Sequence, residues 1–371
     1  MTDPAPEIRD QLPTQDKDAR RKAILQTVGL AAYLVVVFGI LLPSVIDYGE
    51  VVEAFAATPP QWLLVVGLIG IAGWFAEGLA LKVLMPGLGL LRSVSAYLIM
   101  AAVGSTMPGP VKLAVGYRTF REWDFPAQAS VLGLTLNSLA TQAGKLLLPA
   151  VAILFLTIAG TFPGPGLLLA FLLLLPVALG IMVLAWVLRS EAFARRVGAF
   201  ATRATGAVLR RINRDPVDLT DRLLDFRDSA KDLLLARAVP TALTQLLARS
   251  MGYFLLLASL RAMGVPESVL PADVILAVYA VVMAVTLLPL APGGAGLPEL
   301  LYISLFGRVV SDPAYDDLIA AGVMLMRGMS WFLPIPVGYV VLLAQRRAHQ
   351  RRSAAGQPEA PAGTGAGGVA P

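Results

Sequence analysis

Residues 287–299 read LLPLAPGGAGLPE and separate two apolar arms, 273–291 and 297–308. The prolines and glycines of this segment, among them Gly293, Gly294 and Gly296, cannot continue a helix, because proline lacks a donor and glycine favours coil. The second arm would form about 18 Å of helix, whereas the hydrocarbon core of a bilayer is about 30 Å thick. The sequence therefore predicts a re-entrant helical hairpin over 273–308, and the alternative is an ordinary loop between two spans.

Composition places the chain in a membrane. It has 371 residues, of which 57% are hydrophobic, and its mean hydropathy is +0.71. Apolar runs of more than about 18 residues recur, whereas a soluble chain alternates apolar with polar positions. The net charge of +5 lies in loops, where membrane topology accounts for it, so no nucleic-acid partner is predicted. There is no cysteine, and the single histidine, His349, falls in a polar tail, so neither a metal site nor a cofactor is predicted.

The pattern of apolar runs predicts an all-α polytopic integral membrane protein. The expected spans cover residues 23–46, 61–84, 127–158, 167–188, 239–260 and 314–344. A second interrupted segment, 94–120, breaks at Pro108 and Gly109, and each of its arms is too short to cross. We therefore predict about six spans and two re-entrant hairpins, which would enter the membrane from opposite sides.

Charged residues predict the orientation and the division of the chain. Basic residues end the N-terminal segment and follow the last span, and the loop 189–238 carries eleven Lys or Arg against seven Asp or Glu. The positive-inside rule then puts both termini and this loop in the cytoplasm. The predicted parts are a polar N-terminus at 1–22, a first membrane repeat at 23–160, a second membrane repeat at 161–345 and a disordered tail at 346–371.

The loop 189–238 also contains a helical pattern. Apolar residues recur in it at steps of three and four, with arginines among them. Such spacing is typical of an amphipathic helix on an anionic lipid surface. The alternative is a basic loop that only fixes the orientation of the chain.

The two membrane repeats show the same order of elements. Each has two spans, an interrupted hairpin and a long span with an internal proline. Pro108 precedes Lys145 by 37 residues, and Pro292 precedes Arg327 by 35. Because each repeat crosses the membrane three times, the two must insert in opposite orientations. Paired interrupted segments in an inverted repeat are typical of transporters with a central binding site.

Six charged residues fall inside the apolar segments: Glu77, Lys112, Lys145, Arg249, Glu299 and Arg327. A charge at the bilayer centre costs a helix roughly 2.5–3.5 kcal/mol, so these side chains should face protein, water or a ligand. Ion pairs are the simplest arrangement, and Glu77 could pair with Arg249 or Lys145. Four cations and two anions nevertheless leave two positive charges, which a bound anion could neutralise.

The second arm of each hairpin begins a helix within the membrane. A helix start presents unpaired N–H groups and a positive dipole end, which attract phosphates and carboxylates. Lys112 and Arg118 lie in the second arm of the first hairpin. Pro298 and Glu299 suit the start of the second, where Glu299 would complement the dipole or act on a ligand.

Two motifs resemble those of a known family. The turn Pro292-Gly293-Gly294-Ala295-Gly296-Leu297-Pro298-Glu299 matches a Pro-Gly-Gly-x-Gly-x-x-Glu pattern. The later Leu325-Met326-Arg327, with its Leu-Pro-x-x-x-Gly ending at Gly338, and the segment Gly116-Tyr117-Arg118 extend the match. The chain thus resembles the lysylphosphatidylglycerol synthase transmembrane, or flippase-like, family over residues 20–345. The first break lacks the Gly-Glu pair that many members carry.

The resemblance implies a bacterial inner-membrane protein that handles anionic phospholipids or polyprenyl-linked glycolipids. Members that transfer lysine carry an additional soluble domain, so we expect no such activity here. On this interpretation Arg327, Lys145, Arg249 and the hairpin tips bind a lipid head group as a flippase would.

Two other functions are compatible with the sequence. The first is a membrane-embedded transferase acting on a lipid-linked sugar, for which the candidate carboxylates are scattered: Asp124, Asp273, Asp312, Asp316 and Asp317. The second is a scaffold for a cell-envelope biosynthesis enzyme, with the loop 189–238 as its docking surface. The chain could also form a homo-oligomer.

The predicted topology can be tested because the chain has no cysteine of its own. An impermeant thiol reagent applied to whole cells should label Val52→Cys and leave Thr205→Cys unlabelled, while both should react after permeabilisation. The opposite pattern of labelling would contradict the predicted orientation.

Overall fold

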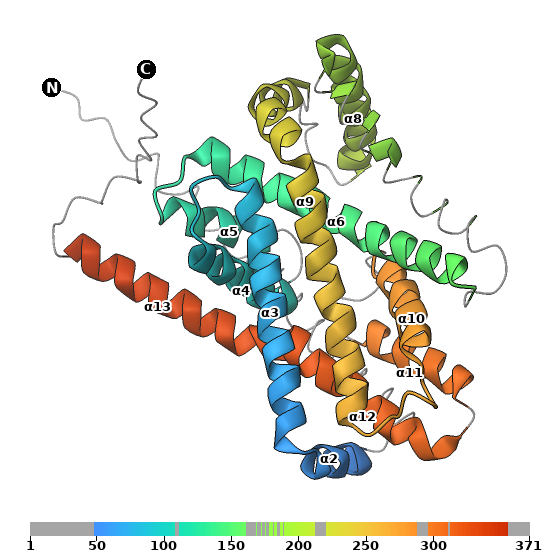
Figure 1. Ribbon diagram of the computed structural model, residues 1–371. Coiled ribbons are helices and arrows are strands. Elements are labelled where there is room, and N and C mark those ends of the chain that lie inside the picture. Colours follow the sequence, from blue (N-terminus) through green and yellow to red (C-terminus); the bar gives the residue numbers. More distant parts are fainter. Residues whose placement is uncertain are drawn as a thin grey trace, which may run out of the picture.

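The computed structural model describes residues 48–107, 111–160, 191–211, 220–287, 296–310 and 312–354, with scattered residues of 168–190. Every regular element in these ranges is a helix (Figure 1). The elements are α2 (Tyr48–Ala57), α3 (Pro60–Leu84), α4 (Leu90–Thr106), α5 (Val111–Arg121), α6 (Ala127–Ile158), α8 (Glu191–Arg211), α9 (Thr220–Ala262), α10 (Ala272–Val285), α11 (Leu297–Val309), the 3-10 turn η3 (Pro313–Tyr315), α12 (Asp316–Arg327), the π-helical turn η4 (Gly328–Phe332) and α13 (Pro334–Ala354).

The chain is an all-α polytopic membrane protein. Four helical stretches among the described residues are long and apolar enough to cross a bilayer: Pro60–Leu84, Ala127–Ile158, Ala236–Ala262 and Pro313–Arg351. They correspond to four of the six predicted spans. The predicted span 23–46 and most of 167–188 lie outside the described residues.

Helices α3 and α9 pack side by side through the middle of the molecule (Figure 1). The described part of the loop 189–238 is helical. Helix α8 occupies its first part, where the helical pattern was predicted, and α9 runs from Thr220 to Ala262 as one element of 43 residues, with Pro240 inside it. Residues 212–219 lie outside the described residues. The function of α8 on a lipid surface stays a prediction.

Both predicted hairpins are built from paired helical arms. Helices α4 and α5 pack on each other, as do α10 and α11. The tips, 108–110 and 288–295, lie outside the described residues, and the depth of the hairpins in the membrane stays a prediction.

The first hairpin is longer than its sequence suggested. Helix α4 begins at Leu90 and has 17 residues, about 26 Å at about 1.5 Å per residue. The prediction placed the start of this segment at 94, whereas α4 already includes Arg92. A long charged side chain near a helix end can extend its charged group toward water, so Arg92 is compatible with the first turn.

The second arm of the second hairpin starts where the sequence predicted. Gly296 caps α11 with a φ of +87°, a conformation that a side chain would strain. Pro298 then occupies the first turn, where its missing N–H costs no hydrogen bond. The glycine therefore turns the chain into α11 and places Glu299 in the first turn.

A π-turn joins α12 to α13 in the last span. Pro334 has no N–H to donate, and the N–H of Leu333 bonds the carbonyl of Gly328 at 2.8 Å, the i→i−5 pattern of a π-turn. The indole N–H of Trp74 donates to the carbonyl of Met329 within the turn at 3.3 Å. A neighbouring span therefore satisfies one carbonyl of the turn.

Helix α13 packs closely on α4. A Cβ at Gly338 would lie 2.1 Å from the carbonyl oxygen of Leu98, so the two backbones are in contact there. The hydroxyls of Tyr339 and Thr106 share a hydrogen bond of 2.5 Å. The helix continues to Ala354, so His349 lies in a helix and not in the polar tail that the sequence suggested.

This contact predicts the effect of a single methyl group. Gly338→Ala should separate α13 from α4 and lower the free energy of unfolding by about 1–3 kcal/mol, the usual cost of overpacking. Gly67→Ala is the matched control, because a Cβ there meets nothing within 4 Å and alanine favours the helix. Thermal unfolding in detergent would measure both, and equal melting temperatures would contradict the close packing.

Candidate functional site

A cavity of about 350 Å³ lies where the two halves of the chain meet. Its walls come from α3, α4, α6, α9, α10, α11, α12 and the π-turn. Four of the predicted site residues line it: Glu77, Lys145, Arg249 and Arg327. Residues that are far apart in sequence therefore meet in one cavity.

The first ion pair of the cavity joins Glu77 of α3 to Arg249 of α9. Both side chains are mostly buried. The Tyr279 hydroxyl donates to the backbone carbonyl of Arg249 at 2.8 Å and holds this turn of α9 against α10. Arg249 Nε is buried, and no residue in the described ranges forms a hydrogen bond with it. The sequence offered Arg249 or Lys145 as the partner of Glu77, and the structure selects Arg249.

The second ion pair joins Glu299 of α11 to Arg327 at the end of α12. Arg327 Nε donates to Glu299 Oε1 at 2.7 Å, and the Glu299 side chain is 0% exposed. The guanidinium of Arg327 also lies over the Trp331 ring, 5.5 Å from its centroid. The second carboxylate oxygen, Glu299 Oε2, is buried and has no hydrogen-bond partner among the described residues. Glu299 is therefore both in the first turn of α11 and bonded to Arg327.

Lys145 is the remaining charge that lines the cavity. Its ammonium donates to the carbonyl of Thr286, at the end of α10, with an N–O distance of 3.4 Å. No carboxylate among the described residues forms an ion pair with it, and Lys112 is close enough to repel its charge. Each ion pair is neutral as a whole, so the net positive charge at the cavity comes from Lys145.

Aromatic residues form much of the remaining wall, and the sequence analysis did not identify them. Trp74, Tyr97, Tyr279, Tyr302 and Trp331 all line the cavity. The rings of Tyr279 and Tyr302 stack with their centroids 6.4 Å apart. Tyrosines inside apolar spans were the available signal in the sequence. A single sequence does not show that tyrosines on different helices meet at one cavity.

A comparison with protein families identifies the membrane domain. The family model for the lysylphosphatidylglycerol synthase TM region matches residues 27–338. The chain belongs to this family. A comparison with curated proteins finds no significant match.

The predicted site of this family member is only partly assembled by the described structure. Gly296 lies next to the cavity as the cap of α11, and Lys112 lies near Lys145. Arg118 is exposed and pairs with Glu122 at 2.9 Å, outside the cavity lining. Pro108, Gly109, Gly293 and Gly294 lie outside the described residues. The described lining of the cavity therefore comes from the spans and from the ends of the hairpin arms.

The charged lining residues of the cavity are Glu77, Arg249, Arg327 and Lys145. Lys145 contributes an ammonium that has no carboxylate partner among the described residues. Within the described residues no three His, Cys, Asp or Glu side chains gather as metal ligands would. The aspartates considered for a transferase are likewise absent from its lining.

The buried ion pair makes a prediction for stability. Arg327→Gln should lower the free energy of unfolding by about 3–5 kcal/mol, because it leaves the Glu299 carboxylate buried without a counter-charge. The double variant Arg327→Gln with Glu299→Gln should recover most of this loss. Unfolding in a mixed-detergent titration would measure it, with the exposed Arg308→Gln as control. A single variant as stable as the control would contradict the pair.

Proposed function

We propose that the protein moves an anionic lipid across the membrane and holds the lipid head group in the cavity. The observation that carries this proposal is the charge left after pairing. Glu77 and Glu299 neutralise Arg249 and Arg327, and Lys145 faces the cavity without a carboxylate. An anion bound there would complete the neutralisation.

The membrane setting makes this remaining charge costly. Water in the headgroup region hydrates an ammonium well, whereas the apolar interior does not. A charged group in the interior therefore needs a partner. The carbonyl of Thr286 is a neutral acceptor at 3.4 Å and leaves the charge in place. A phosphate diester carries one negative charge and would interact with the Lys145 ammonium.

The lining favours a lipid head group over a bare ion. A volume of about 350 Å³ exceeds what one phosphate needs and falls within the usual range for small-molecule sites. Tyr97, Tyr302 and Ser330, which line the cavity, carry hydroxyl groups suited to hydrogen bonds with a glycerol or a sugar. These contacts suit a phosphoglycerol or a phosphate-linked sugar.

The arms of the second hairpin contribute to the cavity. Helix α10 ends at Val285 and α11 starts at Leu297, and residues next to both ends, Thr286 and Pro298, line the cavity. Interrupted helices whose ends meet at a central site are typical of alternating-access transporters, which supports the proposal.

The proposal predicts distinct effects for two substitutions of one residue. In vesicles that contain a fluorescent phosphatidylglycerol, the protein should move label between leaflets, and the rate should be selective over phosphatidylcholine. Lys145→Gln should slow this exchange about tenfold or more, the effect of losing a hydrogen bond to a charged group. Lys145→Arg should keep most of it.

The matched control is Lys82→Gln, because Lys82 is exposed near the end of α3 and does not line the cavity. Mass spectrometry of the lipids that copurify with each variant measures lipid binding separately from lipid transport. Anionic lipid bound equally by Lys145→Gln and by the unmodified protein would exclude the cavity as the head-group site.

A further inference from the structure

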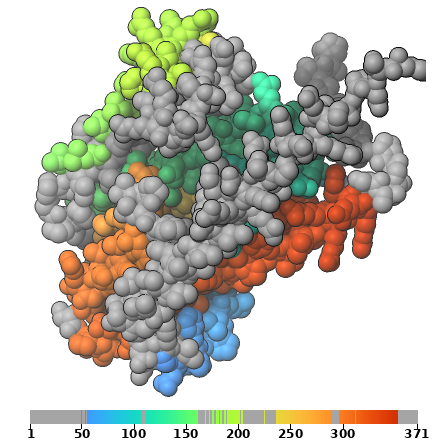
Figure 2. All heavy atoms as spheres, turned by 180° about the vertical axis from the view of Figure 1, so that it is seen from behind, coloured from blue at the N-terminus to red at the C-terminus, as the bar shows by residue number. Residues whose placement is uncertain are grey.

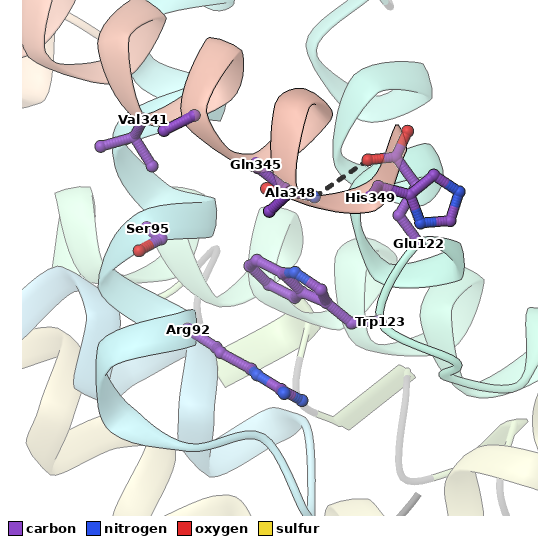
Figure 3. Close-up of a pocket in the computed structure, with 9 residues that line it drawn as sticks. Arg92, Ser95, Glu122, Trp123, Val341, Gln345, Ala348 and His349 are labelled. Atoms are coloured by element: carbon purple, nitrogen blue, oxygen red, sulfur yellow. Dashed lines mark hydrogen bonds between the residues drawn. The ribbon is translucent and has the colours of Figure 1, made fainter. Parts of the chain in front are cut away.

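A second cavity, of about 380 Å³, lies between α4, the end of α5 and α13 (Figure 3). It shares no lining residue with the cavity around Lys145. Arg92 and Ser95 come from α4, Glu122 and Trp123 follow α5, and Gln345 and His349 come from α13. In the close-up the Trp123 ring lies between Arg92 and α13.

The one carboxylate of this cavity already has two partners. Glu122 Oε1 accepts a hydrogen bond from Arg118 Nε at 2.9 Å, and Oε2 accepts one from Gln345 Nε2 at 3.1 Å. The charge of Glu122 is thereby offset by Arg118, and its orientation is fixed from α13. Glu122 is positioned as part of the wall and does not neutralise Arg92.

Arg92 supplies a positive charge without a carboxylate partner among the described residues. Its guanidinium lies over the Trp123 ring, 5.9 Å from the centroid. A cation held on an aromatic face keeps its N–H groups in the plane of the fork available to an acceptor. The cavity therefore presents an oriented guanidinium, the group that best matches the oxygens of a phosphate.

The surface beside this cavity is apolar on both of its helical walls. Leu91, one turn before Ser95, is 72% exposed, and Val340, one turn before Ala344, is 65% exposed. Leu343 on α13 is 53% exposed. The red surface of α13 runs along the outside of the molecule in the space-filling view (Figure 2). A charged cavity bordered by exposed leucine and valine matches a ligand with an ionic head and aliphatic chains.

The neighbouring sequence places the cavity at the end of the spans. Arg92 is in the first turn of α4, and α13 carries Arg346, Arg347 and Arg351 beyond its apolar part. Tryptophan and arginine gather where the hydrocarbon core meets the head groups. The cavity therefore lies at the depth of lipid phosphates, on the side that the positive-inside rule assigns to the cytoplasm.

We propose that this cavity binds the phosphate of one anionic lipid at the membrane surface, with Arg92 as its ligand and Trp123 as the residue that orients Arg92. The acyl chains lie along Leu91, Val340 and Leu343. A free phosphate would share the contact with Arg92 but would make no use of the apolar border. This proposal does not depend on the proposed transport function, because a lipid can bind at this cavity without being moved across the membrane.

The test uses a reporter in the wall of the cavity of the full-length protein. Ser95→Cys introduces a single thiol into the cysteine-free chain, and a bimane label on it reports changes beside Trp123. The labelled protein is placed in phosphatidylcholine nanodiscs with increasing fractions of phosphatidylglycerol. We expect a saturable change in bimane fluorescence with phosphatidylglycerol and none when inorganic phosphate is added to pure phosphatidylcholine discs.

Substitutions then assign the response. Arg92→Gln should raise the phosphatidylglycerol fraction at half-saturation about tenfold, which corresponds to the loss of one charge-assisted hydrogen bond. For Arg92→Lys the phosphatidylglycerol fraction at half-saturation should lie between the values for the unmodified protein and for Arg92→Gln. Arg308→Gln, an exposed arginine at the end of α11, is the matched control and should change nothing. Native mass spectrometry of the unlabelled proteins should show one fewer bound phosphatidylglycerol in Arg92→Gln, while the melting temperature stays unchanged.

Three results would overturn the proposal. They are an equal response to inorganic phosphate, an equal response to phosphatidylcholine, and an unchanged response after Arg92→Gln. Lys145→Gln separates this site from the proposed transport function, since it should leave the bimane response intact. Loss of the response in Lys145→Gln would assign the signal to the central cavity and overturn the surface site.

Discussion

The ion pair between Arg327 and Glu299 is the contact on which the arrangement of the second half depends. Glu299 is fully buried, and an ionised carboxylate in such a place is tolerated only with a counter-charge at hydrogen-bond distance. The pair connects α12 to the first turn of α11, so the position of the second hairpin is set by the last span. The pair of Glu77 and Arg249 connects α3 to α9 in the same way. Between them the two pairs fix four helices around one cavity.

The last span contacts both hairpins. Because Pro334 cannot donate a backbone hydrogen bond, the chain forms a π-turn after Arg327. Helix α12 then contacts α11, and α13 contacts α4 through the backbone at Gly338. Trp74 bonds the carbonyl of Met329 inside the turn and limits the number of unsatisfied groups there. A displacement of either hairpin would therefore change contacts with the same span.

The two cavities differ in how their positive charge is held. In the central cavity the partly buried Lys145 is surrounded by spans and lies against the end of α10. At the surface the exposed Arg92 lies against an indole and near exposed aliphatic side chains. Helices therefore enclose the first charge on several sides, and the second charge is open to the surface. A lipid-handling protein can use the second arrangement for contact with the bilayer and the first for selection.

Length and hydropathy, which are local properties, were enough to predict the all-helical membrane class, four of the described helices and the start of α11 at Leu297. The sequence also predicted an excess of positive charge inside the apolar segments, but it counted Lys112, which the structure leaves exposed and outside the lining of the cavity. Tertiary structure alone decided which charges meet: Arg249 with Glu77, Arg327 with Glu299, and Lys145 with neither. It also revealed the surface cavity, since Arg92, Trp123 and Gln345 lie on elements that no sequence periodicity relates. Ion pairing depends on distances of a few ångströms between separate helices, and these distances are set by packing, which leaves no local signature in the chain.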